Sequence, residues 1–232
     1  MERLCIIPAR GGSKRLPGKN IKYLNGKPLV FYTIDAVLKS DMFDKVIFTS
    51  DDDTILDTVS NNYSSTVLGV IKRPLELADD TSKVIDTVMY LLDEDYDQTW
   101  LTLPTSPLKT SDDFLKASDL LTSEDDSVIS YTEMEFPPTL GLVVKSNNII
   151  EDYDQTQPWQ NGNSRSQDHP TIYRPNGALY GAWTSKLKEN KNYYVGQTKG
   201  YFMPRYRSID IDTQFDFDLA EFTLKYNNVQ SI

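Results

Sequence analysis

Cysteine and histidine occur once each in this 232-residue chain, and no long apolar run is present. The single cysteine, Cys5, has no partner for an internal disulfide, so we expect a reducing compartment, the cytoplasm. The first apolar run breaks at Pro8 and leads into basic residues, which is unlike a secretory signal peptide. No stretch approaches the roughly 20 consecutive apolar residues that cross a bilayer, so we expect no membrane partner.

An excess of positive charge is also absent. The 24 lysines and arginines are outnumbered by 34 aspartates and glutamates, which gives a net charge of -10. Such a surface repels nucleic acid, so a nucleic-acid partner is not expected. The hydrophobic content of 39% nevertheless suffices for a globular core. Any anion-binding site must therefore gather its cations locally.

The apolar segments alternate between strand-like and helix-like spacing. Strands are expected at 3–7, 45–49, 65–70, 99–103, 127–131 and 177–183. Helices are expected at 28–39, 111–121, 184–190 and 213–226. Two further helices are expected to begin after Asp52 or Asp53, and at Asp80 or Thr81, the latter ending at about residue 92. This alternation indicates an α/β fold with a doubly wound, mostly parallel sheet, in one domain over residues 1–232. Parallel sheets bind ligands beyond the carboxyl ends of their strands, so the loops after residues 7, 49 and 103 should converge on one cleft.

Residues 133–173 interrupt the alternation. A hairpin is expected from the apolar runs at 140–144 and 148–150, and a polar loop with several prolines follows. We interpret this segment as an excursion inserted in the main sheet.

The loop at residues 8–20 combines four cations with three glycines. Glycines let backbone N–H groups approach a polyanion, and Arg10 can grip phosphate with two donors while Lys14 and Lys19 act as point charges. We therefore predict an anion site here, against the alternative of a solvated basic surface loop. The pattern is neither GxGxxG nor the GxxxxGKS/T phosphate loop, which disfavours a Rossmann dehydrogenase or a P-loop kinase. The candidate anion-binding residues are Arg10, Gly11, Gly12, Ser13, Lys14, Lys19 and Asn20, with Arg15 as a helper.

Two aspartates, Asp210 and Asp212, lie two residues apart in a short extended segment near the C-terminus. Residues with this spacing on extended backbone face the same way, and paired carboxylates form a hard oxygen site suited to Mg²⁺. The alternative is that Asp212 and Thr213 cap the helix that follows.

Six ordered sequence blocks resemble the acylneuraminate cytidylyltransferases, the CMP-sialic acid synthetase family. The first block is IPARGGSK at 7–14, with Pro17, KNI at 19–21 and GKP at 26–28 behind it. The others are RPLELADDT at 73–81, PTSPL at 104–108, QDHP at 167–170, RPNGALY at 174–180 and IDIDT at 209–213. The blocks extend along nearly the whole chain, whereas the related enzymes that activate the acid Kdo share only a shorter opening.

The resemblance implies a nucleotidyltransferase-type, Rossmann-like fold, with CTP and an acidic 2-keto sugar as substrates and Mg²⁺ as cofactor. It also implies a homodimer formed through residues 133–173. The anomeric hydroxyl of the sugar would attack the α-phosphorus of CTP, and pyrophosphate would leave. Protein catalysis of such a transfer is mainly positioning and charge neutralisation. The catalytic residues implied are Arg10, Lys19, Asp210 and Asp212, and the two aspartates would bind the metal.

The resemblance also implies the binding residues. CTP would lie on the loop at 8–20 and near Arg73 and Thr81, although Arg73 can instead form a salt bridge with a nearby carboxylate. Asp51 is left open between a supporting role and a helix cap. We interpret His169 as a bystander. The sugar-binding candidates are Arg165, Gln167, Arg174 and Asn176.

Three positions depart from the family pattern. Leu103 stands where the family often has glutamine, Thr139 lies where a lysine is common, and Ser166 replaces an arginine before the QD pair. An apolar side chain cannot replace an amide's hydrogen bonds to a sugar, so the substrate is N-acetylneuraminate or another acid such as a legionaminate, a pseudaminate or Kdo. A non-catalytic family relative is the alternative of another class. A sugar-1-phosphate nucleotidyltransferase is disfavoured because its GxGTRL-like loop is missing.

Overall fold

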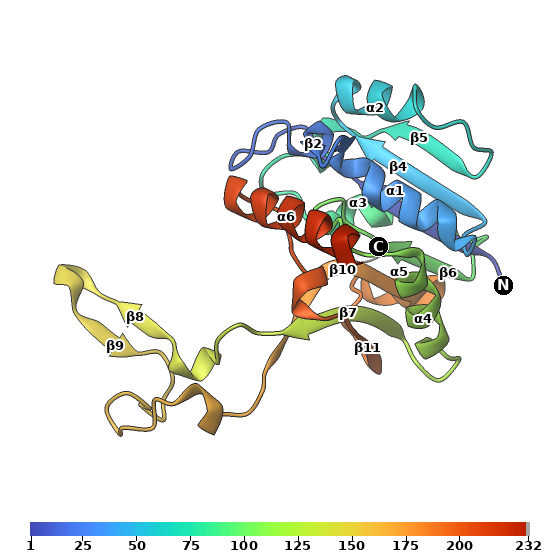
Figure 1. Cartoon of the computed structure of the whole chain (residues 1–232). Helices are drawn as coiled ribbons and strands as arrows, with labels where there is room; N and C mark the ends of the chain where they lie inside the picture. Colours follow the sequence, from blue (N-terminus) through green and yellow to red (C-terminus); the bar gives the residue numbers. More distant parts are fainter. Residues whose placement is uncertain (231–232) are drawn as a thin grey trace.

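A seven-stranded sheet forms the centre of the computed structural model, which describes residues 1–230 and side chains as far as Tyr226 (Figure 1). Its strands are β1 (Arg3–Pro8), β4 (Lys45–Ser50), β5 (Leu68–Lys72), β6 (Gln98–Leu101), β7 (Ser127–Glu133), β10 (Tyr173–Trp183) and β11 (Thr198–Phe202). They lie in the order β11-β7-β10-β6-β1-β4-β5. Neighbouring strands are parallel except around β10, which runs antiparallel to both β6 and β7. The prediction of a mostly parallel sheet is confirmed.

Helices cover both faces of the sheet. One face packs against α1 (Leu29–Ser40), α2 (Asp53–Ser60) and α4 (Ser111–Leu120), and the other packs against α3 (Val84–Leu91) and α5 (Thr184–Asn190). Alternate residues of β1 supply the two cores, because Cys5 belongs to the first and Leu4 to the second. The doubly wound arrangement therefore follows from a first strand that is apolar on both sides.

The last helix, α6 (Gln214–Gln230), packs apart from both layers. A third apolar cluster joins Phe217 and Ala220 of α6 to Leu24 in the short strand β2 (Tyr23–Leu24), which pairs with β3 (Lys27–Pro28). Ile211 belongs to the same cluster. This packing places the C-terminal segment beside the loop that follows β1, although the two lie at opposite ends of the sequence.

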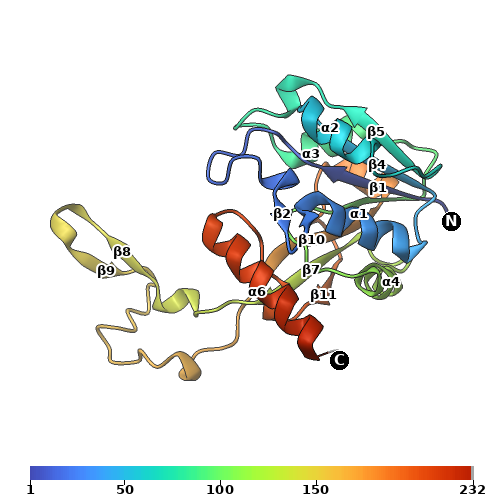
Figure 2. The same ribbon diagram turned by 45° about the horizontal axis from the view of Figure 1, so that its top comes forward.

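An arm, residues 134–172, projects from the body between β7 and β10 (Figures 1 and 2). It carries the hairpin of β8 (Leu142–Val144) and β9 (Ile150–Asp152). The expected hairpin is present, although its first strand begins two residues later than expected and its second strand is shifted by two residues. Short 3-10 turns connect the elements at Lys19–Ile21, Leu75–Leu77, Pro138–Leu140, Ser146–Asn148, Ser166–Asp168 and Arg205–Arg207.

Several boundaries expected from the sequence are wrong, because local side chains form turns there. The strand β5 begins at Leu68 rather than Ser65, since the Ser65 hydroxyl accepts a hydrogen bond from the Val67 N–H and closes a turn. The helix α3 begins at Val84 rather than at residue 80 or 81, since Asp79 accepts from the two N–H groups of residues 81 and 82.

Two features of the sheet were not expected. The edge strand β11 is missing from the prediction, because its polar, glycine-containing sequence lacks a clear apolar alternation. The strand β10 begins at Tyr173, and its pairing with β7 is interrupted around Gly177, whose φ is 75°. Within residues 1–230, no helix combines the length and the apolar character needed to cross a membrane.

Candidate active site

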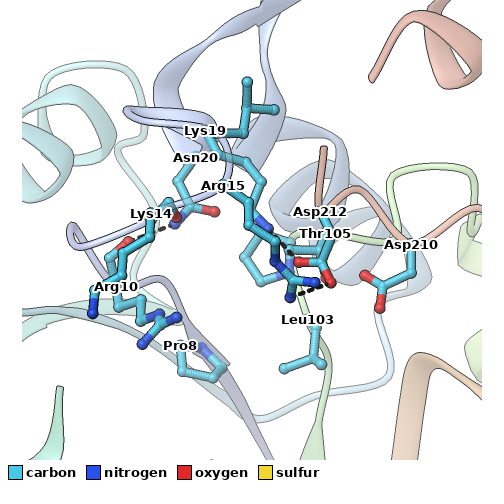
Figure 3. A pocket seen from close by; sticks show the side chains of 13 residues that line it. Pro8, Arg10, Lys14, Arg15, Lys19, Asn20, Leu103, Thr105, Asp210 and Asp212 are labelled. Carbon is cyan, nitrogen blue, oxygen red and sulfur yellow. Dashed lines mark hydrogen bonds and ion pairs between the residues drawn. The ribbon is translucent and has the colours of Figure 1, made fainter. Parts of the chain in front are cut away.

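A cleft of about 460 Å³ opens beyond the carboxyl ends of β1 and β6 (Figure 3). The loops after residues 7 and 103 line it as expected, whereas the loop after residue 49 supplies none of its lining residues. The cleft also brings the cationic loop and the aspartate pair together. Its lining consists of Pro8, Arg10, Ser13, Lys14, Arg15, Leu16, Lys19, Asn20, Leu103, Pro104, Thr105, Asp210 and Asp212.

The cationic loop, residues 8–20, is fixed by contacts of its backbone. The Gly11 N–H donates to Asp51 Oδ1 at 3.1 Å, and the Asn20 side chain donates to the carbonyl of Arg10 at 2.8 Å. A Cβ on Gly11 would lie 2.7 Å from the Cβ of Asp52, so only glycine allows this approach. Asp51 therefore supports the loop, while its neighbour Asp52 caps α2.

The segment at 209–212 presents both aspartates to the cleft. Ile211 between them is fully buried, and its N–H donates to the carbonyl of Thr105 at 2.8 Å. Because neighbouring residues of extended backbone face opposite ways, burying Ile211 turns Asp210 and Asp212 outward. The alternative role considered for Asp212 and Thr213 was to cap the helix that follows. Thr213 forms this cap, because its hydroxyl and its N–H both donate hydrogen bonds to Asp216.

Asp212 pairs with two cations of the loop. Arg15 lies 2.8 Å from Asp212 Oδ2, and Lys19 lies 3.1 Å from Oδ1. Lys19 is largely buried and also donates to the carbonyl of Ile211 at 2.6 Å. The basic loop and the acidic segment thus hold each other across the cleft.

Asp210 has an unusual electrostatic environment. The residue is exposed, yet desolvation by the protein around its carboxyl raises the pKa, and the negative charge of Asp212 raises it further, while a hydrogen bond from Thr105 and the charges of Lys19 and Lys109 act in the opposite direction. A divalent cation between the two carboxylates would offset both the cost of desolvating the Asp210 charge and the repulsion between the two negative charges. The residues present therefore fit a metal ion, with oxygen as the donor atom.

A second cleft, of about 280 Å³, adjoins the first and shares Pro8, Arg10 and Leu103 with it. Arg73 lines it and is only 6% exposed. The Arg73 guanidinium lies 3.2 Å from Asp51, so the salt bridge considered as an alternative is present at a residue that also borders the cleft. Thr81 lies beside the cleft but does not line it, because its hydroxyl donates to Asp79 at 2.9 Å.

The other two cations of the loop share one carboxylate, that of Asp80. Arg10 lies 3.4 Å from Asp80 and Lys14 lies 2.5 Å from it. The Lys14 hydrogen bond is the main cause of the lowered pKa of Asp80. All four loop cations are thus paired with either Asp80 or Asp212. From the sequence, Asp80 is a candidate helix start and a member of the block at 73–81, and nothing local reveals this long-range pairing.

The sugar-binding candidates on β10 lie close to the cleft but differ from each other. Arg174 lines a third cleft, of about 600 Å³, which shares Asp210 with the first. Asn176 is 1% exposed, and its amide bonds Ser130 at 2.5 Å and Ser208 at 2.9 Å. The Asn176 side chain therefore joins β10 to β7 and to Ser208, and it lines none of the four clefts described in this section.

The candidates on the arm are not brought to the main cleft. Arg165 is exposed and its nearest carboxylate is Asp168, at 3.7 Å. Gln167 lines a separate cleft of about 260 Å³ together with His169. The imidazole of His169 bonds Thr139 at 3.1 Å and the carbonyl of residue 163 at 2.8 Å, so it joins two stretches of the arm.

The chain is similar to known proteins over nearly its whole length. The sequence profile of the family described as Cytidylyltransferase matches residues 4–229. An N-acylneuraminate cytidylyltransferase of Streptococcus agalactiae is 35% identical over 221 residues, which are 94% of this chain and 52% of that protein. A pseudaminic acid cytidylyltransferase of Campylobacter jejuni is 32% identical over an alignment of 243 residues, covering 98% of each. This chain thus spans about half the length of the first relative and nearly all of the second.

A solved structure shares the fold. CMP:2-keto-3-deoxy-manno-octonic acid synthetase complexed with CTP superimposes with a TM-score of 0.71 at 14% identity, over 98% of this chain and 100% of that chain. At this identity the likeness concerns the fold alone, and the nucleotidyltransferase-type fold expected from the sequence is confirmed.

Proposed function

This chain belongs to the cytidylyltransferase family, and on that premise we propose that it transfers CMP from CTP to the anomeric hydroxyl of an acidic 2-keto sugar of the nonulosonate class. Pyrophosphate is released, and the CMP-sugar serves glycan biosynthesis. We place the reaction in the cytoplasm, where the free thiol of Cys5 stays reduced. One observation carries the proposal: the cationic loop and the aspartate pair line the same cleft.

The loop cations bind the triphosphate in this proposal. Arg10 borders both the main cleft and the cleft of Arg73, so the nucleoside lies toward Arg73 and the phosphates lie along the loop. Lys19 and the aspartates lie on the other side of the main cleft. The α-phosphate then lies between Arg10 and the aspartates, where the hydroxyl of the sugar attacks it. Arginine and lysine neutralise charge that builds up on the phosphate oxygens and on the departing pyrophosphate.

Mg²⁺ is the cofactor that we propose for the aspartate pair. Asp210 and Asp212 supply two carboxylates, and within the part of the chain that the structure describes no larger group of acidic, histidine or cysteine side chains gathers. A magnesium ion bound through one or two carboxylates and substrate phosphates matches this donor set. When bound, it neutralises phosphate charge and lowers the pKa of the attacking hydroxyl. Lys19, already paired with Asp212, fixes the orientation of that carboxylate.

The acid sugar occupies the third cleft in our proposal, because Asp210 connects that cleft to the main one. Arg174 and Arg205 line it and offer guanidinium groups to the carboxylate of the sugar. The nonulosonate itself is N-acetylneuraminate or a relative such as a legionaminate or a pseudaminate, with Kdo as the eight-carbon alternative. Leu103 lines the main cleft and not the third, so it favours an acid sugar whose part reaching into the main cleft is apolar, because leucine offers no hydrogen bond.

We further propose a homodimer formed through the arm. The hairpin exposes a set of large apolar side chains: Leu142, Val143, Val144, Ile149, Ile150 and Tyr153. A two-stranded hairpin is marginal in water by itself, and a contiguous apolar patch of this kind marks a contact surface. A second copy is the occupant we propose, because the same arm carries the sugar-binding candidates Arg165 and Gln167, which do not line the main cleft of their own chain and would contribute to the cleft of another.

The test of this function is pyrophosphate release from CTP with a panel of acid sugars. The panel contains N-acetylneuraminate, a legionaminate, a pseudaminate and Kdo, each with and without Mg²⁺. We expect turnover with at least one nine-carbon acid and none when CTP is replaced by ATP. No release with any acid sugar, while CTP still raises the melting temperature, would remove the transferase assignment and leave nucleotide binding.

A further inference from the structure

A buried lysine, Lys109, lies beneath the main cleft and has no part in the mechanism above. It is 3% exposed and follows the turn that connects β6 to α4. Its Nζ donates to the carbonyl of Leu103 at 2.7 Å and to the carbonyl of Ser106 at 2.8 Å. One ammonium group thus ties together both ends of the turn at 103–106, whose residues 103–105 line the cleft.

The same turn holds the aspartate segment. The carbonyl of Thr105 accepts the hydrogen bond of the Ile211 N–H at 2.8 Å. Ile211 lies between Asp210 and Asp212, so any movement of Thr105 changes where both carboxylates point. Ser106 connects the turn more weakly to β10, because its hydroxyl donates a hydrogen bond to the carbonyl of Asn176 at 3.4 Å.

We propose that Lys109 is a positioning residue that holds the turn at 103–106 so that Thr105 fixes Asp210 and Asp212 at the cleft. The proposal rests on the function proposed above, and it concerns the chain's own residues. Lys109 itself does not line the cleft, so it acts through Thr105 and Ile211 and not on a substrate.

The chemistry of the buried position supports a specific role. Burying an ammonium group is costly unless hydrogen bonds compensate, and an apolar side chain of similar volume would avoid that cost. Burial lowers the pKa of Lys109 to about 7, while Cys5, Asp210 and Asp113 act in the opposite direction and favour its charged form. Both the charged and the neutral amine donate to the two carbonyls. An apolar replacement would leave Leu103 O and Ser106 O without their lysine donor.

Lys109→Met tests the proposal, with Thr99→Val as the matched control. Methionine keeps the length of the chain but removes the donors. Thr99 lies on β6, buried, and bonds Thr184 at 2.9 Å away from the cleft, so its loss lowers stability without touching the turn. In K109M we expect the Ile211 amide to exchange with solvent about tenfold faster in the substrate-free protein, while T99V keeps its wild-type rate.

Kinetics supply the second measurement. In K109M we expect kcat to fall and the Mg²⁺ concentration for half-maximal rate to rise, each about tenfold, with the dissociation constant of CTP changed less than about threefold. Equal stability loss in K109M and T99V with unchanged kcat, or an unchanged Ile211 exchange rate, overturns the proposal. If K109M does not fold, Lys109→Arg decides: retained protection of the Ile211 amide supports the role, and lost protection contradicts it. Because exchange needs no substrate, a wild-type protein without transferase activity refutes the proposed function separately.

Discussion

The cleft and the arm are built in different ways. At the cleft, contacts join distant parts of one chain, since Lys19 donates to the carbonyl of Ile211, 192 positions away. On the arm, the cross-strand pair Val144 and Ile150 is 65% and 60% exposed, with no apolar layer above it. The proposed CTP side is therefore assembled within a single chain, whereas the sugar-binding candidates on the arm lie away from the main cleft.

The difference has a consequence for how the two regions respond to substitution. Changes at the cleft should affect nucleotide chemistry without changing oligomeric state. Changes on the arm should affect association first, and acid-sugar use through it. Nucleotide binding and subunit association thus become separate observables for the two regions.

The largest effect is expected from Asp212→Asn at the cleft. Asparagine keeps the shape but removes the charge that faces Arg15 and Lys19. We expect turnover to fall roughly 10³-fold, because a charge-stabilising group of the transition state is lost. Pyrophosphate release under saturating substrates measures this loss.

Asp218→Asn is the control for that substitution. Asp218 lies on α6 and accepts from Gln214 at 2.6 Å, outside the cleft. It should keep wild-type turnover, and both variants should remain dimers. Near-normal activity of D212N would show that Asp212 is not a catalytic residue. The proposed division of roles between cleft and arm would then lose its main support.

The next largest effect is expected on the arm, from Val144→Asp combined with Ile150→Asp. Burying two carboxylates in an apolar contact is strongly unfavourable, so we expect the dissociation constant of the proposed dimer to rise about 10²-fold or more. Light scattering measures the mass, and calorimetry measures CTP binding, which should stay within about twofold of wild type. Turnover with the acid sugar should fall together with the dimer fraction.

Glu151→Gln serves as the arm control, since it changes a charged residue of the same hairpin that pairs with Lys145. It should remain dimeric. A double aspartate variant that stays dimeric shows that the arm is not the interface. A monomer with full sugar turnover shows instead that the arm contributes nothing to the sugar site.

The sequence predicted the cleft better than the arm for a physical reason. Strand β1 is apolar and buried on both sides, and the glycines and cations after it identify a ligand loop by composition alone. The spacing of Asp210 and Asp212 left a metal site and a helix cap as alternatives, and the family resemblance favoured the metal site. Features of this kind are local, so a single sequence displays them.

The rest depended on contacts between distant residues. Asp80 looks like a helix start until the fold brings it against Arg10. Lys109 looks like a surface lysine, because only the turn at 103–106 supplies the carbonyls that bury it. Asn176 belongs to a block that resembles a binding motif, yet its amide is engaged with Ser130 and Ser208 inside the sheet.

A smaller effect than that of the arm is expected from Arg10→Ala at the cleft. Charge-assisted hydrogen bonds contribute about 1.5–3 kcal/mol each, so the dissociation constant of CTP should rise roughly 10- to 100-fold. Calorimetry with CTP measures the change. Lys72→Ala is the control, because Lys72 pairs with Asp53 at 2.7 Å and its loss changes the net charge equally. If R10A and K72A weaken CTP equally, the loop acts only through the overall charge of the protein.

The smallest effect, and the one of opposite sign, is expected from Asp80→Asn. The carboxylate of Asp80 occupies Arg10 and Lys14, the cations that the triphosphate needs, so it competes with the ligand. Because these groups are exposed, the competition is weak, and D80N should tighten CTP binding about two- to threefold. The lowered pKa of Asp80 keeps the carboxylate charged, so the gain should be the same between about pH 6 and pH 8. Weaker CTP binding in D80N would mean instead that Asp80 orients the two cations for the phosphates. In either case the mass of D80N in solution should equal that of the wild type, since the association that we propose uses the arm, which this substitution does not touch.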